Sequence, residues 1–288
     1  MQTRSQAFGL TDAELATRST VYRDDALLGQ VILVTGGAGG FGRAMAILFT
    51  RLGADVVIAG RDGDRLAAAA ASVGNLTGRT PFHHPVNIRQ PDSVDALYDA
   101  VQARHGRIDT LVNNAGGQFA QNAIDFSRKG WLAVIDTNLN GTWWMMQGAA
   151  QRWRDQARPG NIINIVVPIA RGIPQTAHTT AARAGIVYLS KTVSTEWAPL
   201  GIRVNCVAPG TIESDGFQHY DPVAVARFRN ANPLKMLGDV WDVAEGCAYL
   251  AAPSAKFITG EVLTIDGGMQ QWGTAWSAGR PDYFKEGE

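Results

Sequence analysis

A glycine-rich stretch is the first feature of this sequence with an evident chemical use. Residues 35–42 read TGGAGGFG and stand between an apolar run and a stretch with helical spacing. Glycine has no Cβ, so the backbone there can turn tightly and approach a pyrophosphate closely. The start of the following helix adds free N–H groups and a positive dipole. We therefore expect a dinucleotide to contact Gly36, Gly39, Gly40, Phe41 and Gly42.

A basic side chain stands where the ribose of such a dinucleotide would be read. Arg61 is the first residue after the run DVVIAG, roughly 20 residues beyond the glycine turn. An acid at this place would bind a ribose 2′-hydroxyl, whereas a guanidinium suits a 2′-phosphate. We therefore expect the cofactor to be NADP(H). The neighbouring Asp62 argues for NAD(H) unless its carboxylate caps the next helix.

A third cluster of polar side chains lies in AHTTAARAG, residues 177–185, ahead of a helix. His178 is the one plausible base, because a threonine hydroxyl is too weakly acidic and Arg183 stays protonated. Thr179 and Thr180 can donate hydrogen bonds to a developing oxyanion. The alternative for these residues is helix capping, which Thr commonly performs. Catalysis and capping both remain open from the sequence.

These residues require a scaffold of alternating strands and helices. Seven short apolar runs read as strands: residues 30–35, 55–60, 82–87, 108–116, 160–167, 202–210 and 261–268. Helical patterns separate them, including a long one at residues 129–153 and another at 178–198. The alternation predicts an α/β fold, a Rossmann-type doubly wound sheet of about seven parallel strands with helices on both faces.

The domain organisation is simple. Residues 1–29 form an N-terminal extension in which Thr11 and Glu14 fit a capping box at the start of a short helix. We expect this arm to pack on the body or on a partner subunit. Residues 30–270 form a single dinucleotide-binding domain, and residues 271–288 form a C-terminal tail.

Composition excludes several classes of protein. The 288-residue chain is 45 % apolar and has zero formal net charge, which gives no electrostatic case for nucleic acid or an anionic membrane. Cys206 and Cys247 form no CxxC pair. His83 and His84 are adjacent on a strand, so their rings face opposite sides and no metal site is expected. Without an apolar leader or membrane-spanning run, we expect a cytoplasmic protein.

Several motifs together resemble the short-chain dehydrogenase/reductase family. The resemblance covers about residues 28–270 and rests on the glycine turn, NNAG at 113–116, Asn138 in DTNLNG, IRVNCVAPG at 202–210 and FITGEVLTIDGG at 257–268. It implies that Asn114, Ala115 and Gly116 line the nucleotide cleft and that Asn87 meets the adenine.

The resemblance also implies a nicotinamide and substrate end of the site. Pro209, Gly210 and Ile212 would lie beside the nicotinamide, with Ser214 in reach of its carboxamide. Residues 211–237 would form a lid over the substrate. Gln118, Phe119 and Tyr220 would contact the substrate, with Phe217 and Phe228 adding apolar wall. Members of the family are commonly homotetramers, so the resemblance also implies a homotetramer.

The reaction residues depart from the family pattern of Ser, Tyr, Lys and Asn. Asn138 matches the Asn, and in the family this residue bends a helix around a bound water. Thr179 occupies the Tyr position, Arg183 the Lys position, and Val167 or Pro168 the Ser position. Arg183 can still bind the nicotinamide ribose. Tyr188 and Lys191 are three residues apart, not four, and read as helix body.

The departure itself resembles one branch of the family. NNAGGQF, KGW, NIVVP, AHTTAARAG and EWA are similar to the trans-2-enoyl-CoA and 2,4-dienoyl-CoA reductases. Bacterial enzymes of citronellol and other acyclic terpenoid breakdown are equally similar.

Three hypotheses follow from this resemblance. The first is NADPH-dependent reduction of the C=C of a trans-2-enoyl thioester, with Asn138, His178, Thr179 and Arg183 at the reacting centre. Tyr220 is a further candidate acid, and Arg171 and Lys235 are candidates for a CoA 3′-phosphate. The second is an NADP-dependent alcohol or aldehyde dehydrogenase of acyclic terpenoids, with His178 as base. The third is a nucleotide-binding protein with altered or lost catalysis.

Overall fold

Seven parallel strands form the central sheet of the protein. The computed structural model describes residues 8–272, so residues 1–7 of the extension and 273–288 of the tail lie outside the described residues. The strands are β1 (Val31–Thr35), β2 (Asp55–Gly60), β3 (Phe82–Pro85), β4 (Thr110–Asn113), β5 (Gly160–Ile165), β6 (Ile202–Pro209) and β9 (Val262–Ile265). Their order is β3-β2-β1-β4-β5-β6-β9, which confirms the predicted doubly wound sheet.

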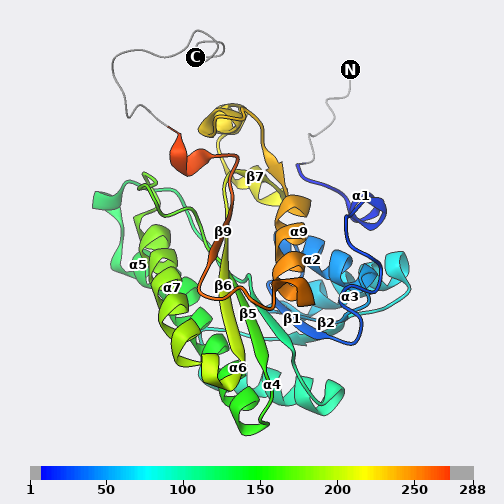
Figure 1. Cartoon of the computed structure of the whole chain (residues 1–288). Coiled ribbons are helices and arrows are strands. Elements are labelled where there is room, and N and C mark those ends of the chain that lie inside the picture. Colours follow the sequence, from blue (N-terminus) through cyan, green and yellow to red (C-terminus); the bar gives the residue numbers. More distant parts are fainter. Residues whose placement is uncertain (1–7, 273–288) are drawn as a thin grey trace.

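Helices cover both faces of this sheet (Figure 1). They are α1 (Asp12–Thr17), α2 (Gly40–Arg51), α3 (Gly63–Thr77), α4 (Pro91–His105), α5 (Arg128–Ile135), α6 (Thr142–Asp155), α7 (Ala177–Glu196), α8 (Pro222–Arg227) and α9 (Val240–Ala251). Helices α2, α3 and α9 pack on one face, and α4, α6 and α7 pack on the other. None of the helices in the described part of the chain is long and apolar enough to cross a membrane.

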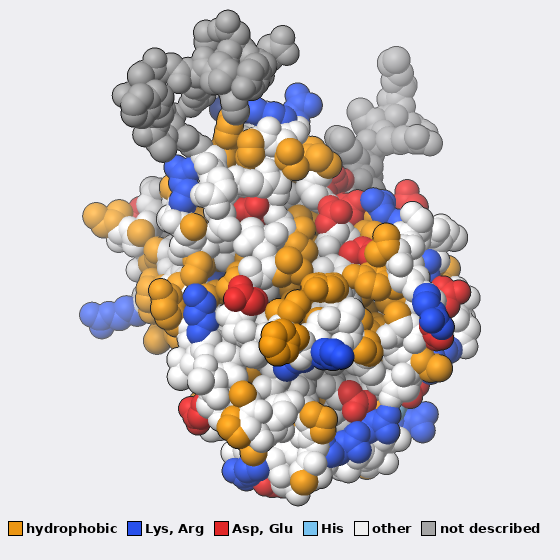
Figure 2. Space-filling view, in the orientation of Figure 1, with side chains coloured by type: hydrophobic (Ala, Val, Ile, Leu, Met, Phe, Trp, Pro, Cys, Tyr) orange, Lys and Arg blue, Asp and Glu red, His pale blue; other side chains and the backbone are white. Residues whose placement is uncertain are grey.

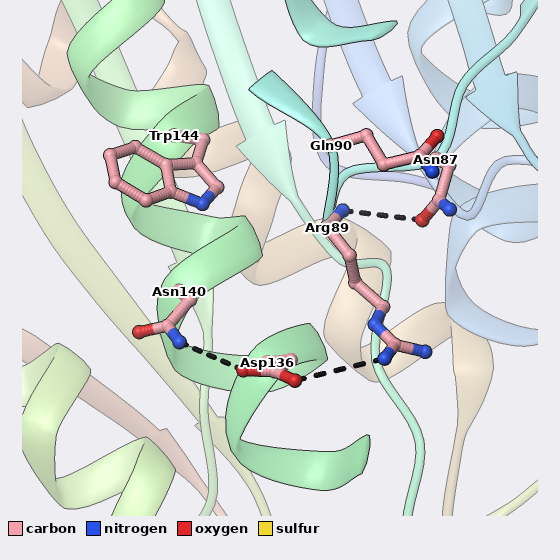
Figure 3. Close-up of a pocket in the computed structure, with 6 residues that line it drawn as sticks. All are labelled: Asn87, Arg89, Gln90, Asp136, Asn140 and Trp144. Atoms are coloured by element: carbon pink, nitrogen blue, oxygen red, sulfur yellow. Dashed lines mark hydrogen bonds and ion pairs between the residues drawn. The ribbon is translucent and has the colours of Figure 1, made fainter. Parts of the chain in front are cut away.

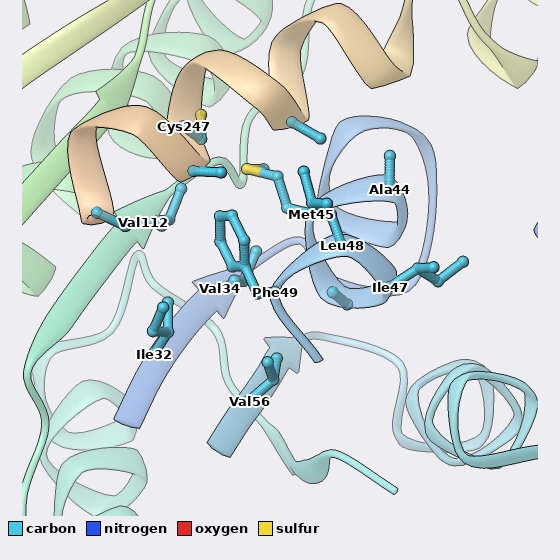
Figure 4. Close-up of a cluster of buried hydrophobic side chains, with 14 of the residues drawn as sticks. Ile32, Val34, Ala44, Met45, Ile47, Leu48, Phe49, Val56, Val112 and Cys247 are labelled. Carbon is cyan, nitrogen blue, oxygen red and sulfur yellow. The ribbon is translucent and has the colours of Figure 1, made fainter. Parts of the chain in front are cut away.

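Alternation along the buried strands divides the core into two layers. Ile32 and Val34 of β1 point to the face covered by α2 and α9, where Met45 and Phe49 of α2 meet them (Figure 4). Leu33 points to the opposite face, toward α4 and α6. This two-residue period explains why β1 reads as a continuous apolar run, since both of its faces are buried.

The predicted long helix at residues 129–153 widens in its middle. A π-helical segment, Asp136–Gly141, joins α5 to α6 and contains the buried Asn138. A Cβ on Gly141 would lie 2.8 Å from Ile88, so the widened turn fits closely against the chain after β3. Segments of this kind are frequent at functional sites.

The N-terminal extension packs on the body of the same chain. The capping box predicted at Thr11 and Glu14 is confirmed, since each side chain accepts a hydrogen bond from the backbone of the other residue. Leu15 and Leu27 are buried, with exposed fractions of 2 % and 1 %. The arm, residues 8–29, therefore shares the core cluster formed by α2 and α9.

A second, two-stranded sheet encloses the segment predicted to be a lid. Strands β7 (Ile212–Glu213) and β8 (Gly238–Asp239) pair in parallel, and residues 214–237 lie between them. This lid segment contains α8 and stands above the carboxyl ends of the large sheet (Figure 1). It therefore borders the edge at which parallel α/β sheets bind ligands.

Candidate active site

The carboxyl ends of β1 and β4 are tied together at the point where the strand order reverses. The hydroxyl oxygen of Thr35 accepts the backbone N–H groups of Asn114 and Ala115, each at 3.0 Å. The Asn114 amide donates in return to the carbonyl oxygens of Thr35 and Gly36, at 2.9 and 3.3 Å. The glycine turn and the NNAG turn thus form one rigid edge.

Three glycines of the turn, Gly36, Gly37 and Gly42, have no room for a side chain. A Cβ on Gly42 would lie 2.2 Å from the carbonyl oxygen of Gly36, and one on Gly36 would lie 2.9 Å from the Asn114 amide. Gly36 also has a φ of +67°, which favours glycine. Gly39 and Gly40 are less enclosed, since a Cβ on either would make only ordinary contacts, at 3.5 to 3.7 Å, with Asp215 or Arg65. This arrangement fits a pyrophosphate, which needs close backbone approach and a helix N-terminus.

A cleft of about 580 Å³ follows this edge of the sheet. Eleven predicted residues line it: Gly36, Gly39, Gly40, Phe41, Arg61, Asn87, Asn114, Ala115, Gly116, Gln118 and Phe119. Gly42 packs beneath the turn, and Pro209, Gly210 and Ile212 lie at the end of β6 and the start of β7. Ser214 and Asp215 of the lid segment close the cleft from the other side.

The end of the cleft at which the ribose is predicted to bind carries two arginines, Arg61 and Arg65. Asp62 is the N-cap of α3 and accepts the Arg65 backbone N–H at 3.0 Å, so its carboxylate serves the helix. Arg65 stands one helical turn beyond Arg61, and its guanidinium lies 3.6 Å from where a Cβ on Gly39 would be. We had not singled out Arg65, although a second arginine four residues after Arg61 is visible in the sequence.

The loop after β3, which is predicted to meet the adenine, forms one wall of a neighbouring hollow. Asn87 accepts the Arg89 backbone N–H at 3.2 Å, and Arg89 faces Asp136 at 3.7 Å (Figure 3). The Asn140 amide donates to Asp136 at 3.0 Å, while Trp144 lies across the hollow (Figure 3). The polar loop is therefore held against the π-helical segment that contains Asn138.

Asn138 fixes the turn that leads to the substrate side. Its side-chain oxygen accepts the Gly117 N–H at 3.0 Å, and its amide donates to the Gly117 carbonyl at 2.9 Å. A Cβ on Gly116 would lie 2.1 Å from the Arg183 guanidinium and 3.0 Å from Asn138. The fold thus brings Gly116, Asn138 and Arg183 into direct contact, although they are distant in sequence.

Arg183 is a buried charge without a carboxylate. It is 7 % exposed and forms no ion pair within residues 8–272. One guanidinium nitrogen, Nη1, is buried with no hydrogen-bond partner in the same part of the chain. Burial lowers the pKa of Arg183 to about 10, so the group stays cationic at neutral pH. An unpaired buried charge is costly and indicates a place for an electron-rich ligand atom.

Thr179 stands one turn before Arg183 on the same face of α7. It is 3 % exposed, and its hydroxyl has no hydrogen-bond partner among the described residues. Helix α7 begins at Ala177 with Thr176 as N-cap, so Thr179 does not cap the helix. Two donors, a hydroxyl and a guanidinium, are therefore left free at the start of α7.

His178 is enclosed by aromatic rings. It is completely buried, stacked on Phe126 and edge-on to Phe119, with both ring centroids 4.5 Å away. Its Nδ1 accepts the Thr179 N–H at 2.7 Å, and its Nε2 has no partner within residues 8–272. Burial lowers the pKa of His178, while the Thr176 backbone opposes the shift. The ring is thus neutral at pH 7. Phe126 gave no signal in the sequence because its role depends on tertiary stacking.

The lid segment reaches the same pocket from above. The Gln118 amide donates to the Tyr220 hydroxyl at 3.1 Å. Phe228 packs edge-on against both Phe217 and Tyr220. The predicted substrate residues Gln118 and Tyr220 are thus in direct contact, with an apolar wall behind them.

Other candidate residues lie apart from this pocket or are engaged elsewhere. Tyr188 is 69 % exposed, and Lys191 lies over its ring. Arg171 is exposed, and the Lys235 ammonium lies 4.9 Å from the Trp272 ring centroid. No cluster of potential metal ligands occurs among the described residues, which include His83 and His84.

Comparison with known proteins agrees with this geometry. A family profile described as "Enoyl-(Acyl carrier protein) reductase" matches residues 36–270. A probable 2,4-dienoyl-CoA reductase of Bacillus subtilis is 36 % identical, covering 84 % of this chain and 96 % of the relative. The 3-oxoacyl-[acyl-carrier-protein] reductase FabG of Chlamydia trachomatis is also 36 % identical, over 84 % of this chain and 98 % of FabG.

A solved structure adds a third relative. The citronellol catabolism dehydrogenase AtuB of Pseudomonas aeruginosa PAO1 is 33 % identical, with a TM-score of 0.78 over 88 % of this chain and 99 % of AtuB. The chain belongs to the short-chain dehydrogenase/reductase family. It is an oxidoreductase of a family that uses a nicotinamide cofactor, and the glycine cradle described above fits such a group.

Because the charge of Arg183 is unpaired, we predict that removing it raises stability and abolishes activity. Arg183→Met keeps the length of the side chain but removes the buried charge, so the cofactor-free protein should become more stable by about 1 kcal/mol. For a chain of this size we expect a rise in melting temperature of about 2–4 °C, measured by calorimetry, together with loss of turnover.

A matched arginine provides the control for this experiment. The Arg203 side chain is also partly buried, but it donates to the carbonyl oxygens of Ile258 and Leu250, each at 3.2 Å. Arg203→Met should lower the melting temperature because it removes two hydrogen bonds that methionine cannot replace, although Asn205 and Asn161 still donate to those carbonyl oxygens. An equal fall for Arg183→Met and Arg203→Met would show that Arg183 is a structural residue.

Proposed function

We propose that this protein transfers hydride from NADPH to the C=C of a trans-2-enoyl thioester. The observation that carries the proposal is the pair of free donors at Thr179 and Arg183, where the family pattern has an acid and a lysine. A buried hydroxyl and a buried cation can hold a negative oxygen, but neither can take a proton from an alcohol.

Reduction of an enoyl thioester requires what these residues supply. When bound, the dinucleotide would supply a hydride, and a new C–H bond would form at Cβ of the thioester. The π electrons then move to the thioester oxygen as an enolate, and water or a weak acid protonates Cα. Thr179 and Arg183 donate to that oxygen, and fixed donors of this kind contribute up to roughly 3–4 kcal/mol each. Asn138 positions the Gly116–Gly117 turn beside them.

The state of His178 also favours this chemistry. The ring is completely buried and enclosed by Phe119 and Phe126. Its Nδ1 is occupied by the Thr179 backbone N–H, and its Nε2 is not accessible from the surface. A substrate hydroxyl therefore does not reach either ring nitrogen in the described conformation. Oxidation of an alcohol would require a base that this arrangement does not supply.

A terpenoid alcohol or aldehyde is the second candidate substrate. It is favoured by similarity to AtuB, whose name refers to citronellol catabolism. Phe119, which lines the cleft, and the cluster of Phe217, Tyr220 and Phe228 in the lid segment suit a branched hydrocarbon as well as an acyl chain. Charge in the lid segment favours the thioester over the alcohol. Arg227 and Arg229 are exposed there, and their positive charges would attract an anionic carrier such as CoA but not an uncharged alcohol.

We further propose that the protein acts as a cytoplasmic homotetramer. The support is the hydrophobic surface that gathers in the middle of the face formed by α9 and β9 (Figure 2). Exposed hydrophobic side chains of this region include Tyr249, at 37 %, and Phe257, at 99 %. Apolar surface of this kind is typical of subunit contacts.

The two arginines at the ribose end predict a preference for NADPH over NADH. Arg61→Ala and Arg65→Ala should each raise the Michaelis constant for NADPH by about 10- to 100-fold, as expected for loss of a charge-assisted hydrogen bond. The constant for NADH should change little. The exposed Arg104 at the end of α4 lies outside the cleft, so Arg104→Ala is the control. Equal effects on both coenzymes would contradict a 2′-phosphate site.

The proposed reaction is tested with a panel of substrates. Purified protein should consume NADPH with trans-2-enoyl-CoA esters of short and medium length, followed by absorbance. It should leave citronellol and related terpenoid alcohols unoxidised with NADP⁺. Turnover of an alcohol with no turnover of any enoyl-CoA would reject the proposal in favour of the second candidate. Binding of NADPH with no turnover of either class would indicate altered catalysis.

A further inference from the structure

The N-terminal arm contacts the lid segment, and the previous subsections assign it no role. The Gly9 backbone N–H donates to Glu213 of β7 at 3.1 Å. The Phe8 ring lies 5.9 Å from the Phe217 ring, centroid to centroid. A Cβ on Gly9 would lie 3.2 Å from the Ser214 backbone, so the two segments are in backbone contact. Figure 1 shows the start of the arm beside β7 and the first turn of α9.

The same arm is anchored to the helix that follows the glycine turn. Asp12 accepts hydrogen bonds from the Arg43 guanidinium of α2 and, at 2.6 Å, from Ser72 of α3. Burial opposes ionisation of Asp12, yet these hydrogen bonds hold its pKa below the usual value. Arg43 lies in the first turn of α2, three residues after Gly40. The carboxylate thus fixes the arm to the helix end that would face the pyrophosphate.

Further contacts attach the arm to the base of the lid segment. Arg18 forms an ion pair with Asp239, with the charged atoms 2.6 Å apart. Asp239 is the N-cap of α9 and also belongs to β8, the strand that pairs with β7. The Tyr22 hydroxyl donates to the Glu245 carbonyl at 3.0 Å, and the Trp241 indole donates to the Ser19 carbonyl at 3.2 Å. The arm is therefore held along its length, and only its first described residues reach the lid segment itself.

These contacts meet around one small cavity. It has a volume of about 180 Å³ and is lined by the arm, the glycine turn and the lid segment, with Gly39, Gly40, Ser214 and Asp215 among its residues. The same four residues line the large dinucleotide cleft. A dinucleotide would contact the glycine turn and the lid segment from one side, while the arm supports both from the other.

We propose that Phe8 and Gly9 of the arm, through Phe217 and Glu213, position the lid segment over the glycine turn and thereby strengthen dinucleotide binding. The arm is a positioning element for the cofactor site, and this role does not depend on which substrate is reduced. Without these contacts the lid segment keeps its own fold, but the arm no longer holds it in position relative to α2. Dinucleotide affinity falls because binding must then also order the lid segment.

The test compares paired variants of the full chain. Phe8→Ala and Glu213→Ala remove the ring contact and the hydrogen-bond acceptor, whereas Phe8→Leu and Glu213→Gln retain an apolar contact and an acceptor oxygen. Val21 is 90 % exposed on the same arm, so Val21→Ala is the neutral control. The dissociation constant for NADPH is measured by titration calorimetry. Trypsin cleavage at the exposed Arg227 and Arg229 reports on the lid segment.

We expect the two alanine variants to raise the dissociation constant about five- to tenfold and to lose the protection from trypsin that NADPH gives. The conservative variants and Val21→Ala should remain close to wild type. Wild-type affinity and protection in both alanine variants would overturn the proposal. So would a loss of binding that merely follows a fall in melting temperature, as expected for Leu15→Ala at the buried anchor of the arm.

Discussion

The site depends on a buried positive charge that the protein itself leaves unpaired. Arg183 is surrounded by Gly116, Asn138 and the start of α7, and no carboxylate within residues 8–272 neutralises it. A charge in this position lowers the free energy of unfolding of the ligand-free protein, and other interactions in the fold must offset that loss. In return, a ligand whose negative charge approaches Gly116, which lines the cleft and contacts Arg183, is stabilised. The Thr179 hydroxyl beside it has no partner among the described residues, so it can add a directional hydrogen bond to the same ligand.

The rest of the molecule holds this charge in a fixed position relative to the glycine turn. The Thr35–Asn114 hydrogen bonds join β1 to β4, and Asn138 joins the turn after β4 to the π-helical segment. Each link connects elements far apart in sequence, and each uses an amide or hydroxyl with little side-chain freedom. The geometry is therefore set before a ligand arrives, as electrostatic stabilisation requires. The arm extends the same support to the lid segment.

The sequence allowed the sheet and most of the cleft to be predicted, because both rest on local signals. Apolar runs separated by helical patterns determine the strands, and the glycine turn and NNAG are short motifs. The capping role of Asp62 was one of two alternatives that the sequence left open, and the structure decides between them. The unpaired state of Arg183 and the aromatic enclosure of His178 by Phe126 were not predictable. They arise where residues from several elements meet, and no spacing along the chain encodes such contacts. The choice between capping and catalysis at Thr179 likewise needed the position of the N-cap, Thr176.

The most direct test of the account locates the transferred hydride. The protein is given NADPH deuterated at the transferred position, with an equimolar mixture of a trans-2-enoyl-CoA and the 3-oxoacyl-CoA of the same length. Both share the carrier and chain, but reduction of the ketone requires a proton on its oxygen and reduction of the C=C does not. We predict deuterium on Cβ of the saturated acyl-CoA. Deuterium on the carbinol carbon of a 3-hydroxyacyl-CoA, with the enoyl-CoA untouched, would contradict the account.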